Sequence, residues 1–311
     1  MKLSHIRKIM ETYQHVANMS RSIQQKEILE KLGLEPGDIY QELEMDSRYV
    51  DTHRDISTAN GNVNLHSHTF YELLYCRGCS GVEYLVGTER YRLQKGDIIV
   101  IRPGISHRPL MPEHMQEPYV RDVIWINGEF LQALEKGKEL SSVRGKSLLR
   151  TANTKWEYLG DHFDAGVREA QNGNEERELA VIGNTVTLLA HLHRAFSDPV
   201  AAPMRAEKPE LLDRVLSYVE NHLAQRITLE EVARQFFVSE STITQTFRKK
   251  MGVSFYRCVT QRRLISAKSL IRQGVALEDV AERTGFSDYS TFYRAFKKEY
   301  GISPRQFRSI T

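Results

Sequence analysis

The spacing of apolar residues along the chain predicts a strand-rich part followed by a helical part. Between residues 49 and 126, short apolar runs alternate with turn residues. The clearest runs cover residues 71–76, 82–86, 91–93, 98–101 and 120–126. This texture predicts the β-strands of a barrel or sandwich. After Gly128 the apolar residues recur every three or four positions, which predicts amphipathic helices.

Two helical segments flank the predicted strands. Residues 1–45 have helical spacing and form an N-terminal extension to which we assign no function. The segment 175–196 fits a helix that pairs with the same helix of a second copy, and it fits equally a helix packed on its own barrel. Its apolar stripe consists of Leu179, Ile182, Val186, Leu189, His193 and Phe196. Three prolines among small residues at 197–209 predict an interdomain linker.

The last hundred residues contain an internal repeat. Residues 227–234 (ITLEEVAR) align with residues 275–282 (VALEDVAE) at an offset of 48. Each repeat continues with a turn, a serine placed to cap a helix (Ser239 or Ser287), and a helix that ends in basic residues and glycine. A helix, a tight turn and a second helix form the helix-turn-helix motif, whose second helix enters the major groove of DNA. The repeat predicts two such units, at 227–252 and 275–301.

The two predicted units differ at their turns. Phe237 stands where Gly285 stands in the second unit, at a position that favours a positive φ. A bulky residue there is strained or forces a different turn. Between the units, residues 254–273 lack proline and glycine. They predict a helix about 30 Å long, comparable to the roughly 34 Å between successive major grooves on one face of DNA.

Composition supports two domains with different partners. The length of 311 residues exceeds one ordinary core, and no apolar run reaches the ~20 residues of a membrane span. Residues 209–311 contain 17 Lys and Arg against 11 Asp and Glu, whereas residues 1–208 contain 26 against 29. This asymmetry predicts a polyanionic partner for the C-terminal domain. Three cysteines cannot form a disulfide framework, so we expect a reducing compartment, the cytoplasm, and no membrane partner.

Further positions, in the segment between the two units and in the second unit, match a known pattern. They are Arg263, Leu264, Ala267, Leu270, Val280, Ala281, Gly285, Phe286, Phe292, Phe296 and the closing Gly301-Ile302-Ser303-Pro304. In this spacing, the last hundred residues resemble the DNA-binding domain of the AraC/XylS family of transcription regulators. The resemblance implies a regulator rather than an enzyme. It implies as partners double-stranded promoter DNA, a small-molecule effector such as a carbohydrate or another small polar metabolite, a second copy of the chain, and RNA polymerase.

The resemblance also implies which side chains meet DNA. Arginine pairs with guanine and glutamine with adenine through two hydrogen bonds. The residues that would contact base edges, early in each second helix, are Ser241, Thr244, Gln245, Tyr289, Ser290, Tyr293 and Arg294. Basic residues toward the helix ends would bind phosphates without sequence preference. These are Arg248, Lys249, Lys250, Lys297 and Lys298.

The strand-rich part carries histidines beside a carboxylate. His66 and His68 lie two apart and so share one face of an extended strand, and Glu72 keeps the same parity. With His107, their order and spacing resemble the two motifs of the cupin family. Three histidines and a carboxylate suit Fe, Mn, Ni or Zn. Three uses stay open, because these residues can bind an effector without metal, hold a divalent metal, or be structural.

Three further features accompany these motifs. Tyr75 and Arg102 are candidates for effector contact because they lie near the motifs, although each is equally a surface charge or a barrel filler. Cys76 and Cys79 straddle a predicted hairpin turn, and a single CxxC pair with no following helix predicts no metal or redox role. The rival function is a metal-dependent cupin enzyme, or a metal-tuned sensor, fused to a DNA-binding domain.

The predicted fold class is α+β with several domains. Residues 46–200 form a cupin-like β-barrel with flanking helices, which binds the effector and dimerises through the helix at 175–196. Residues 210–311 form an all-α domain with two helix-turn-helix units.

Overall fold

A computed structural model describes residues 43, 45–57, 65–79, 81–112, 114–135, 147–172, 174–198 and 209–310. The predicted N-terminal extension lies outside the described residues except for Leu43 and Met45, and so does the central part of the predicted linker, 199–208. The chain divides into two compact units. The larger unit comprises residues 45–220 and 229–255, and the smaller one includes residues 221–228 and 256–311.

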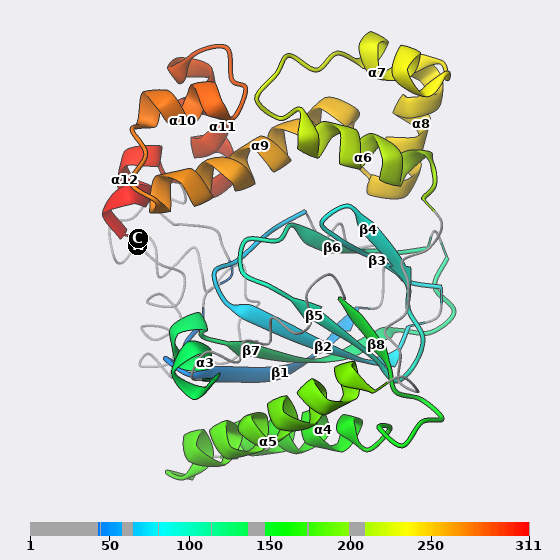
Figure 1. The fold of residues 1–311 in the computed structure, drawn as a ribbon, viewed down its shortest axis with the longest axis vertical. Helices are drawn as coiled ribbons and strands as arrows, with labels where there is room; N and C mark the ends of the chain where they lie inside the picture. The colour runs from blue at the N-terminus through cyan, green and yellow to red at the C-terminus, as the bar shows by residue number, and fades with distance from the viewer. Residues whose placement is uncertain are drawn as a thin grey trace, which may run out of the picture. The chain divides into compact units, whose positions relative to one another are not determined.

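The described strands of the larger unit form two antiparallel sheets (Figure 1). The five-stranded sheet has the order β1-β7-β2-β5-β8. Its strands are β1 (Val50–Ser57), β2 (Tyr71–Gly78), β5 (Asp97–Ile101), β7 (Tyr119–Ile126) and β8 (Leu148–Arg150). The three-stranded sheet has the order β4-β3-β6. Its strands are β3 (Glu83–Val86), β4 (Glu89–Arg92) and β6 (His107–Leu110).

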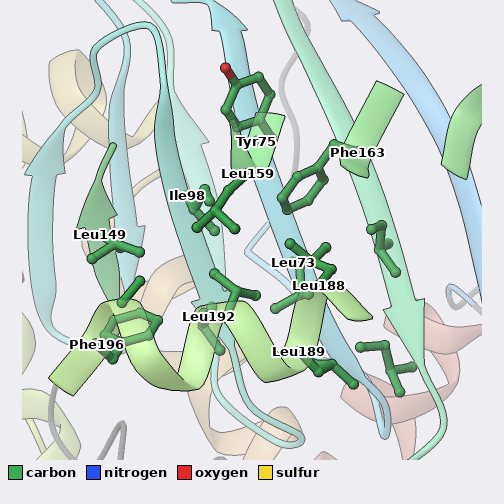
Figure 2. Close-up of a cluster of buried hydrophobic side chains, with 14 of the residues drawn as sticks. Leu73, Tyr75, Ile98, Leu149, Leu159, Phe163, Leu188, Leu189, Leu192 and Phe196 are labelled. Atoms are coloured by element: carbon green, nitrogen blue, oxygen red, sulfur yellow. The ribbon is translucent and has the colours of Figure 1, made fainter. Parts of the chain in front are cut away.

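Side chains on the two faces of the five-stranded sheet enter two different cores. Alternate residues of β2, such as Leu74 and Cys76, join Tyr84 of β3 in an inner core between the sheets. Leu73 and Tyr75 point the other way and pack on the helices α4 (Leu159–Gln171) and α5 (Arg177–Ser197) (Figure 2). Because both faces are buried, the central strands have nearly continuous apolar sequences, which is why β2, β5 and β7 could be predicted.

The predicted fold class is confirmed, although two short strands lacked a sequence signal. Strand β6 consists of His107, Arg108, Pro109 and Leu110. Proline cannot donate to a β-ladder, and sheets accept it mainly on edge strands. Strand β6 is an edge of its sheet, as is β8 of the other sheet.

The predicted apolar stripe of residues 175–196 does not form a single face of α5. Leu189 and Phe196 are buried in the core beneath the five-stranded sheet. Leu179 and Val186 are instead 72% and 36% exposed. One stripe of α5, which includes Leu189 and Phe196, therefore faces the sheet. A second, exposed stripe includes Leu179 and Val186.

The C-terminal residues form two groups of helices joined by α9 (Phe255–Arg272). In the larger unit, α6 (Leu211–Asn221) precedes the helix-turn-helix pair α7 (Leu229–Phe236) and α8 (Glu240–Met251). In the smaller unit, α10 (Leu277–Arg283), α11 (Tyr289–Tyr300) and α12 (Pro304–Ile310) enclose a separate apolar core. The remaining described helix is α3 (Gly128–Glu135). Among the described residues, no helix combines the length and apolar character needed to cross a membrane.

The caps of the two second helices agree with the prediction in one unit and correct it in the other. Ser239 caps α8, accepting a hydrogen bond of 3.1 Å from the backbone N–H of Thr242. In α11 the cap is Asp288, which accepts a bond of 2.7 Å from the N–H of Thr291. Ser287, the predicted cap, donates its hydroxyl to the Asp288 carboxylate. Aspartate and serine are about equally good caps, so sequence alone does not choose between these neighbours.

Candidate functional site

The inner core of the sheet domain contains a buried group of two histidines and a carboxylate. His68, Glu72 and His107 offer ligand atoms that all lie within 4.8 Å of one another. Glu72 comes from β2 and His107 from β6, so one residue of this group belongs to each sheet. Their exposed fractions are 5% or less. Polar groups buried this deeply in an apolar interior are costly unless they are paired, which marks the group as a candidate site.

Backbone carbonyls orient both imidazoles of this group. Nδ1 of His68 lies 2.8 Å from the carbonyl oxygen of Phe70, and Nδ1 of His107 lies 2.9 Å from that of Ile105. A carbonyl can only accept, so both Nδ1 atoms carry the proton. The Nε2 atoms face the carboxylate, at 3.4 Å for His68 and 3.0 Å for His107, both measured to Oε2 of Glu72.

The other carboxylate oxygen is held by a residue that the sequence did not indicate. Nε1 of Trp125 donates to Oε1 of Glu72 across 2.8 Å. Trp125 pairs with Glu72 in the register of β7 and β2. Only the pairing of strands far apart in the chain brings these two residues together, so no local pattern identifies Trp125.

The protonation of the group follows from burial and from these contacts. Burial lowers the pKa of His68, and the nearby Glu72 only partly offsets this effect. Burial alone would raise the pKa of Glu72, but the imidazoles of His107 and His68 outweigh burial and hold it well below its usual value. The favoured state is thus a charged carboxylate beside a neutral His68.

The donor set fits a divalent transition metal. Two imidazoles whose Nε2 atoms face one carboxylate form a common metal-binding combination. Carbonyl acceptors at both Nδ1 atoms and the Trp125 donor on Glu72 are the outer contacts that such ligands need. Among the described residues, the buried Nε2 of His107 has no hydrogen-bond partner of acceptable direction. An ion at this position would be held by His68, Glu72 and His107.

The remaining predicted residues of the sheet domain lie at different distances from this group. His66 pairs with His107 through an isolated bridge, and their rings are 4.2 Å apart, but His66 is not among the three grouped ligands. Arg102 is half-buried in the turn after β5 that also bonds the His68 carbonyl through Gly104. Tyr75 leaves β2 on the face opposite Glu72 and packs on Phe163 of α4, with ring centroids 5.3 Å apart. The structure therefore does not bring Tyr75 together with the group.

The CxxC pair is buried in the inner core. Cys76 and Cys79 are 3% and 6% exposed, and both are free thiols. Their mutual hydrogen bond raises the pKa of Cys76, with burial adding to the increase, and lowers that of Cys79. Buried thiols of this kind are usually inert.

Helix α8 presents most of its predicted DNA contacts to solvent. Ser241 and Gln245 are exposed and joined by a hydrogen bond of 3.2 Å from Nε2 of Gln245, while Thr244 is half-buried. Arg248 and Lys249, the first of the predicted phosphate contacts, are exposed. These residues occupy one side of the helix, whose other side enters the core through Ile243, Phe247 and Met251.

Helix α11 has the same division. Ser290, Arg294, Lys297 and Lys298 are exposed, and Phe292, Phe296 and Tyr300 are buried. Tyr289 and Tyr293 are half-buried, and the Tyr289 ring lies 6.0 Å from that of Phe292. Tyr289 thus contributes to the core of the second unit as well as to its surface.

Within the larger unit, charged residues connect the three-stranded sheet to α6 and α8. Arg90 is 2% exposed and makes ion pairs with Glu83 at 2.7 Å, with Glu210 at 3.0 Å and with Asp213 at 3.2 Å. Nζ of Lys250, a predicted phosphate contact, lies 3.8 Å from Glu83 and 3.5 Å from Glu210. Lys250 is therefore already paired with carboxylates, unlike the exposed Lys298.

A second contact reaches the last turn of α8. Arg108 of β6 donates from Nη1 to the carbonyl oxygen of Met251 across 2.7 Å. Carbonyls at the C-terminal end of a helix lack intrahelical partners and carry partial negative charge, so a guanidinium stabilises them.

Comparisons with known proteins match both parts of the chain. A family model described as a helix-turn-helix domain matches residues 232–310. The HTH-type transcriptional activator RhaS of Salmonella dublin is 26% identical over 254 residues, which span 78% of this chain and 86% of that protein. The probable transcriptional regulator LumQ of Photobacterium leiognathi is 35% identical over 105 residues, 33% of this chain and 42% of LumQ.

A solved structure resembles the C-terminal part. It is the C-terminal domain of AraT, a response regulator from Geobacillus stearothermophilus, with 30% identity and a TM-score of 0.32 over 33% of this chain and 87% of that one. The repeated helix-turn-helix, the family model and the relatives that span both domains give one conclusion. The chain belongs to the AraC/XylS family of DNA-binding transcription regulators.

Proposed function

We propose that a small polar metabolite, such as a carbohydrate, binds in the sheet domain beside His68, Glu72 and His107 and changes the affinity of the chain for promoter DNA. The observation that carries this proposal is the buried polar group itself, set among aromatic residues such as Tyr84 and Trp125. Small-molecule sites combine apolar and aromatic walls with a few polar groups that fix orientation. His66, whose ring lies 4.2 Å from that of His107, and Arg102, in the turn that bonds the His68 carbonyl, are further proposed contacts, whereas Tyr75 is left out of the proposed site.

The route from this site to DNA runs through β6. Residues alternate between faces along a strand. His107 is paired with Val86, whose side chain belongs to the inner core, and Arg108 is paired with Leu85 on the other face. A ligand that moves His107 therefore moves the neighbouring Arg108, which bonds the end of α8. The contact between Arg108 and the Met251 carbonyl can be formed or broken. An effector shifts DNA affinity only if it binds these two states with different affinities.

Base contacts by α8 and α11 belong to the same proposal. Ser241, Thr244 and Gln245 of α8 and Ser290, Tyr293 and Arg294 of α11 would contact base edges, with Tyr289 in a partly structural role. Their exposure on helices opposite the apolar faces supports this assignment. Arg248, Lys249, Lys297 and Lys298 would bind phosphates, and Lys250 would do so after leaving its carboxylate partners. Because this function needs access to DNA, the chain would act in the cytoplasm, as the sequence predicts.

We propose that the chain acts as a homodimer through the exposed stripe of α5. Leu179 and Val186 are exposed apolar residues four and three positions from Gly183, which is also exposed. Small and apolar residues at such steps allow two helices to approach closely. RhaS is named an activator, which supports a further proposal that the bound chain contacts RNA polymerase.

A metal-tuned sensor or a metal-dependent enzyme is the second candidate. The orientation of both Nε2 atoms toward Glu72 favours it, because two imidazole nitrogens and a carboxylate oxygen then lie together as potential metal ligands. A bound ion would supply a Lewis acid beside the effector. RhaS and LumQ are named regulators, which favours a sensor over an enzyme.

One experiment separates these functions. The full-length chain, the double variant His68→Ala/His107→Ala and the control His114→Ala, which changes an exposed histidine, are purified in parallel. Each is measured by elemental analysis, by thermal unfolding in the presence of a panel of sugars and small polar metabolites, and by binding to the duplex upstream of its own gene.

The outcomes are distinct. A compound that raises the unfolding temperature of the parent and of His114→Ala, leaves the double variant unchanged and shifts DNA affinity supports the effector proposal. Stoichiometric metal that only the double variant lacks supports the metal-tuned sensor, and turnover of a panel compound supports the enzyme. DNA affinity that is identical with and without every stabilising compound overturns the coupling.

A further inference from the structure

Phe237 combines backbone strain with exposure at the turn of the first helix-turn-helix unit. Its φ is 56°, in the left-handed region that is unfavourable for any residue with a β-carbon other than Asn or Asp. Its side chain is 96% exposed, so burial does not offset the strain. A residue that is strained and gains nothing from the fold indicates a functional requirement.

The corresponding turn of the second unit has a different constraint. Gly285 has a φ of 78°, and a β-carbon there would overlap the carbonyl oxygen of Leu223 and lie 3.0 Å from Cζ of Arg263. The second turn is therefore packed against the backbone of Leu223 and the side chain of Arg263, and it accepts only glycine. The first turn places its side chain in solvent, which is why a large residue fits at the equivalent position.

The position of Phe237 relates it to the DNA-binding helix. Its N–H bonds the carbonyl of Arg234 at 3.3 Å, and the N–H of Val238 bonds that of Ala233 at 3.0 Å, so the turn is fixed to α7. Two residues further on, Ser239 caps the N-terminus of α8. In helix-turn-helix proteins, the N-terminal residues of the second helix are those that contact bases. The exposed ring thus lies in the turn that leads directly into the base-contacting end of α8.

We propose that Phe237 is a DNA-contacting residue whose ring packs on apolar surface of the duplex, either a thymine methyl group or a deoxyribose. Phenylalanine makes apolar contacts with thymine methyl groups in the major groove. The place of the ring favours DNA over a protein partner, because the first turns of α8 that follow it expose Ser241 and Gln245, two of the proposed base contacts. This inference rests on the proposed role of α8 in base contact.

The test uses substitutions that keep the turn and remove the ring. Glycine and asparagine both tolerate a positive φ, so Phe237→Gly and Phe237→Asn preserve the backbone while Phe237→Tyr preserves the ring. Binding of the full-length variants is measured by fluorescence anisotropy on a duplex selected from a random pool by the parent chain. Gln245→Ala serves as a reference for base contact by α8, and thermal unfolding monitors the fold.

We expect Phe237→Gly and Phe237→Asn to weaken binding about tenfold, as for partial burial of one phenyl ring, with unfolding temperatures equal to or above that of the parent. Phe237→Tyr should bind like the parent. If Gln245→Ala weakens binding and neither ring-deleting variant does, Phe237 does not contact DNA and the proposal fails. If Gln245→Ala, Phe237→Gly and Phe237→Asn all bind like the parent, the proposed base contact by α8 fails as well.

Two further results complete the test. Single thymines are replaced by deoxyuridine, which removes only the methyl group. A replacement that weakens the parent and leaves Phe237→Asn unchanged identifies a methyl contact, whereas a ring effect without sensitivity to deoxyuridine identifies a deoxyribose contact. Weaker binding accompanied by a lower unfolding temperature in both ring-deleting variants would show that the turn needs the ring, and would overturn the proposal.

Discussion

The ring of Tyr75 lies directly against the backbone of Gly160, where a β-carbon would be 2.6 Å from Cζ of the tyrosine. Tyr75 belongs to β2 and Gly160 to the first turn of α4, so this contact sets how closely the helix approaches the five-stranded sheet. The role of Tyr75 is therefore to pack helix on sheet.

Gly160→Ala should destabilise the chain by about 1–3 kcal/mol, because the added methyl group overlaps a buried ring that cannot move away freely. Chemical denaturation measures the loss. Gly128→Ala is the matched control, since a β-carbon at Gly128 meets nothing within 4 Å. Equal stability of the two variants would contradict the close contact between α4 and β2.

A second prediction concerns the exposed stripe of α5. Leu179→Glu combined with Val186→Glu should convert a dimer to a monomer of 35.9 kDa, because two carboxylates would face their copies across an apolar helix pair. Sedimentation equilibrium gives the mass. Gln171→Glu, which adds a charge at the end of α4, should leave the dimer intact. A double variant that sediments like the parent would exclude α5 as the dimer contact.

The sequence predicted the long elements and the residues of the buried group better than their partners. Strands β2, β5 and β7 are apolar enough to stand out, and His68, Glu72 and His107 follow from motif spacing. The opposite orientation of Tyr75 could also have been predicted, because residues three apart in a strand point to opposite faces.

The rest depends on contacts that local sequence does not carry. Trp125 reaches Glu72 only through the pairing of β2 with β7, and β6 has an atypical strand sequence because it is an edge. Whether Asp288 or Ser287 is the cap depends on the exact residue at which α11 begins, and a shift of one residue would change the cap. Such boundaries are the least predictable feature of a helix.

A third prediction separates base contact from phosphate contact. Arg294→Ala should cost about 1–3 kcal/mol on the selected duplex and little on random DNA, because a guanidinium distinguishes guanine through two hydrogen bonds. Lys298→Ala should weaken both duplexes alike and reduce the slope of log affinity against log salt by about one. Anisotropy titrations at several salt concentrations measure both effects. Equal losses on the two duplexes for Arg294→Ala would remove it from the base-contacting set.

A fourth prediction follows from the cap of α11. The Ser287 hydroxyl and the Thr291 N–H hold the pKa of Asp288 at about 2, below its ordinary value of 3.8. A depressed pKa in the folded state means that the charged cap stabilises the fold fully above pH 3.8, and that this contribution is lost as the pH falls toward 2.

Asparagine also caps helices but does not titrate in this range. The stability difference between the parent and Asp288→Asn, measured in urea from pH 6 to pH 2, should therefore shrink as the pH falls through this window. In Ser287→Ala the pH range over which the cap loses its stabilising effect should narrow, because the hydroxyl that contributes most to the lowered pKa of Asp288 is gone. A difference that stays constant with pH would show that the carboxylate charge contributes nothing to the cap.

The last prediction tests the connection between the buried group and α8. His107 and Arg108 are consecutive residues on opposite faces of β6, and only Arg108 bonds the Met251 carbonyl. Arg108→Met keeps much of the side-chain volume and removes the donor. The effector should then bind with nearly unchanged affinity, while its effect on DNA affinity should fall several-fold, because the coupling free energy depends on the contact that differs between the two arrangements.

Titrations of DNA with and without a saturating effector measure, for each protein, the ratio of the two DNA affinities. Arg92→Met, which removes a 65% exposed guanidinium from the same sheet, should keep the ratio of the parent. By linkage, the effect of DNA on effector affinity must fall by the same factor as the effect of effector on DNA affinity. A ratio in Arg108→Met equal to that of Arg92→Met would show that the signal leaves the sheet domain by another route, for which the buried ion pairs of Arg90 with Asp213 and Glu210 are the next contacts to test.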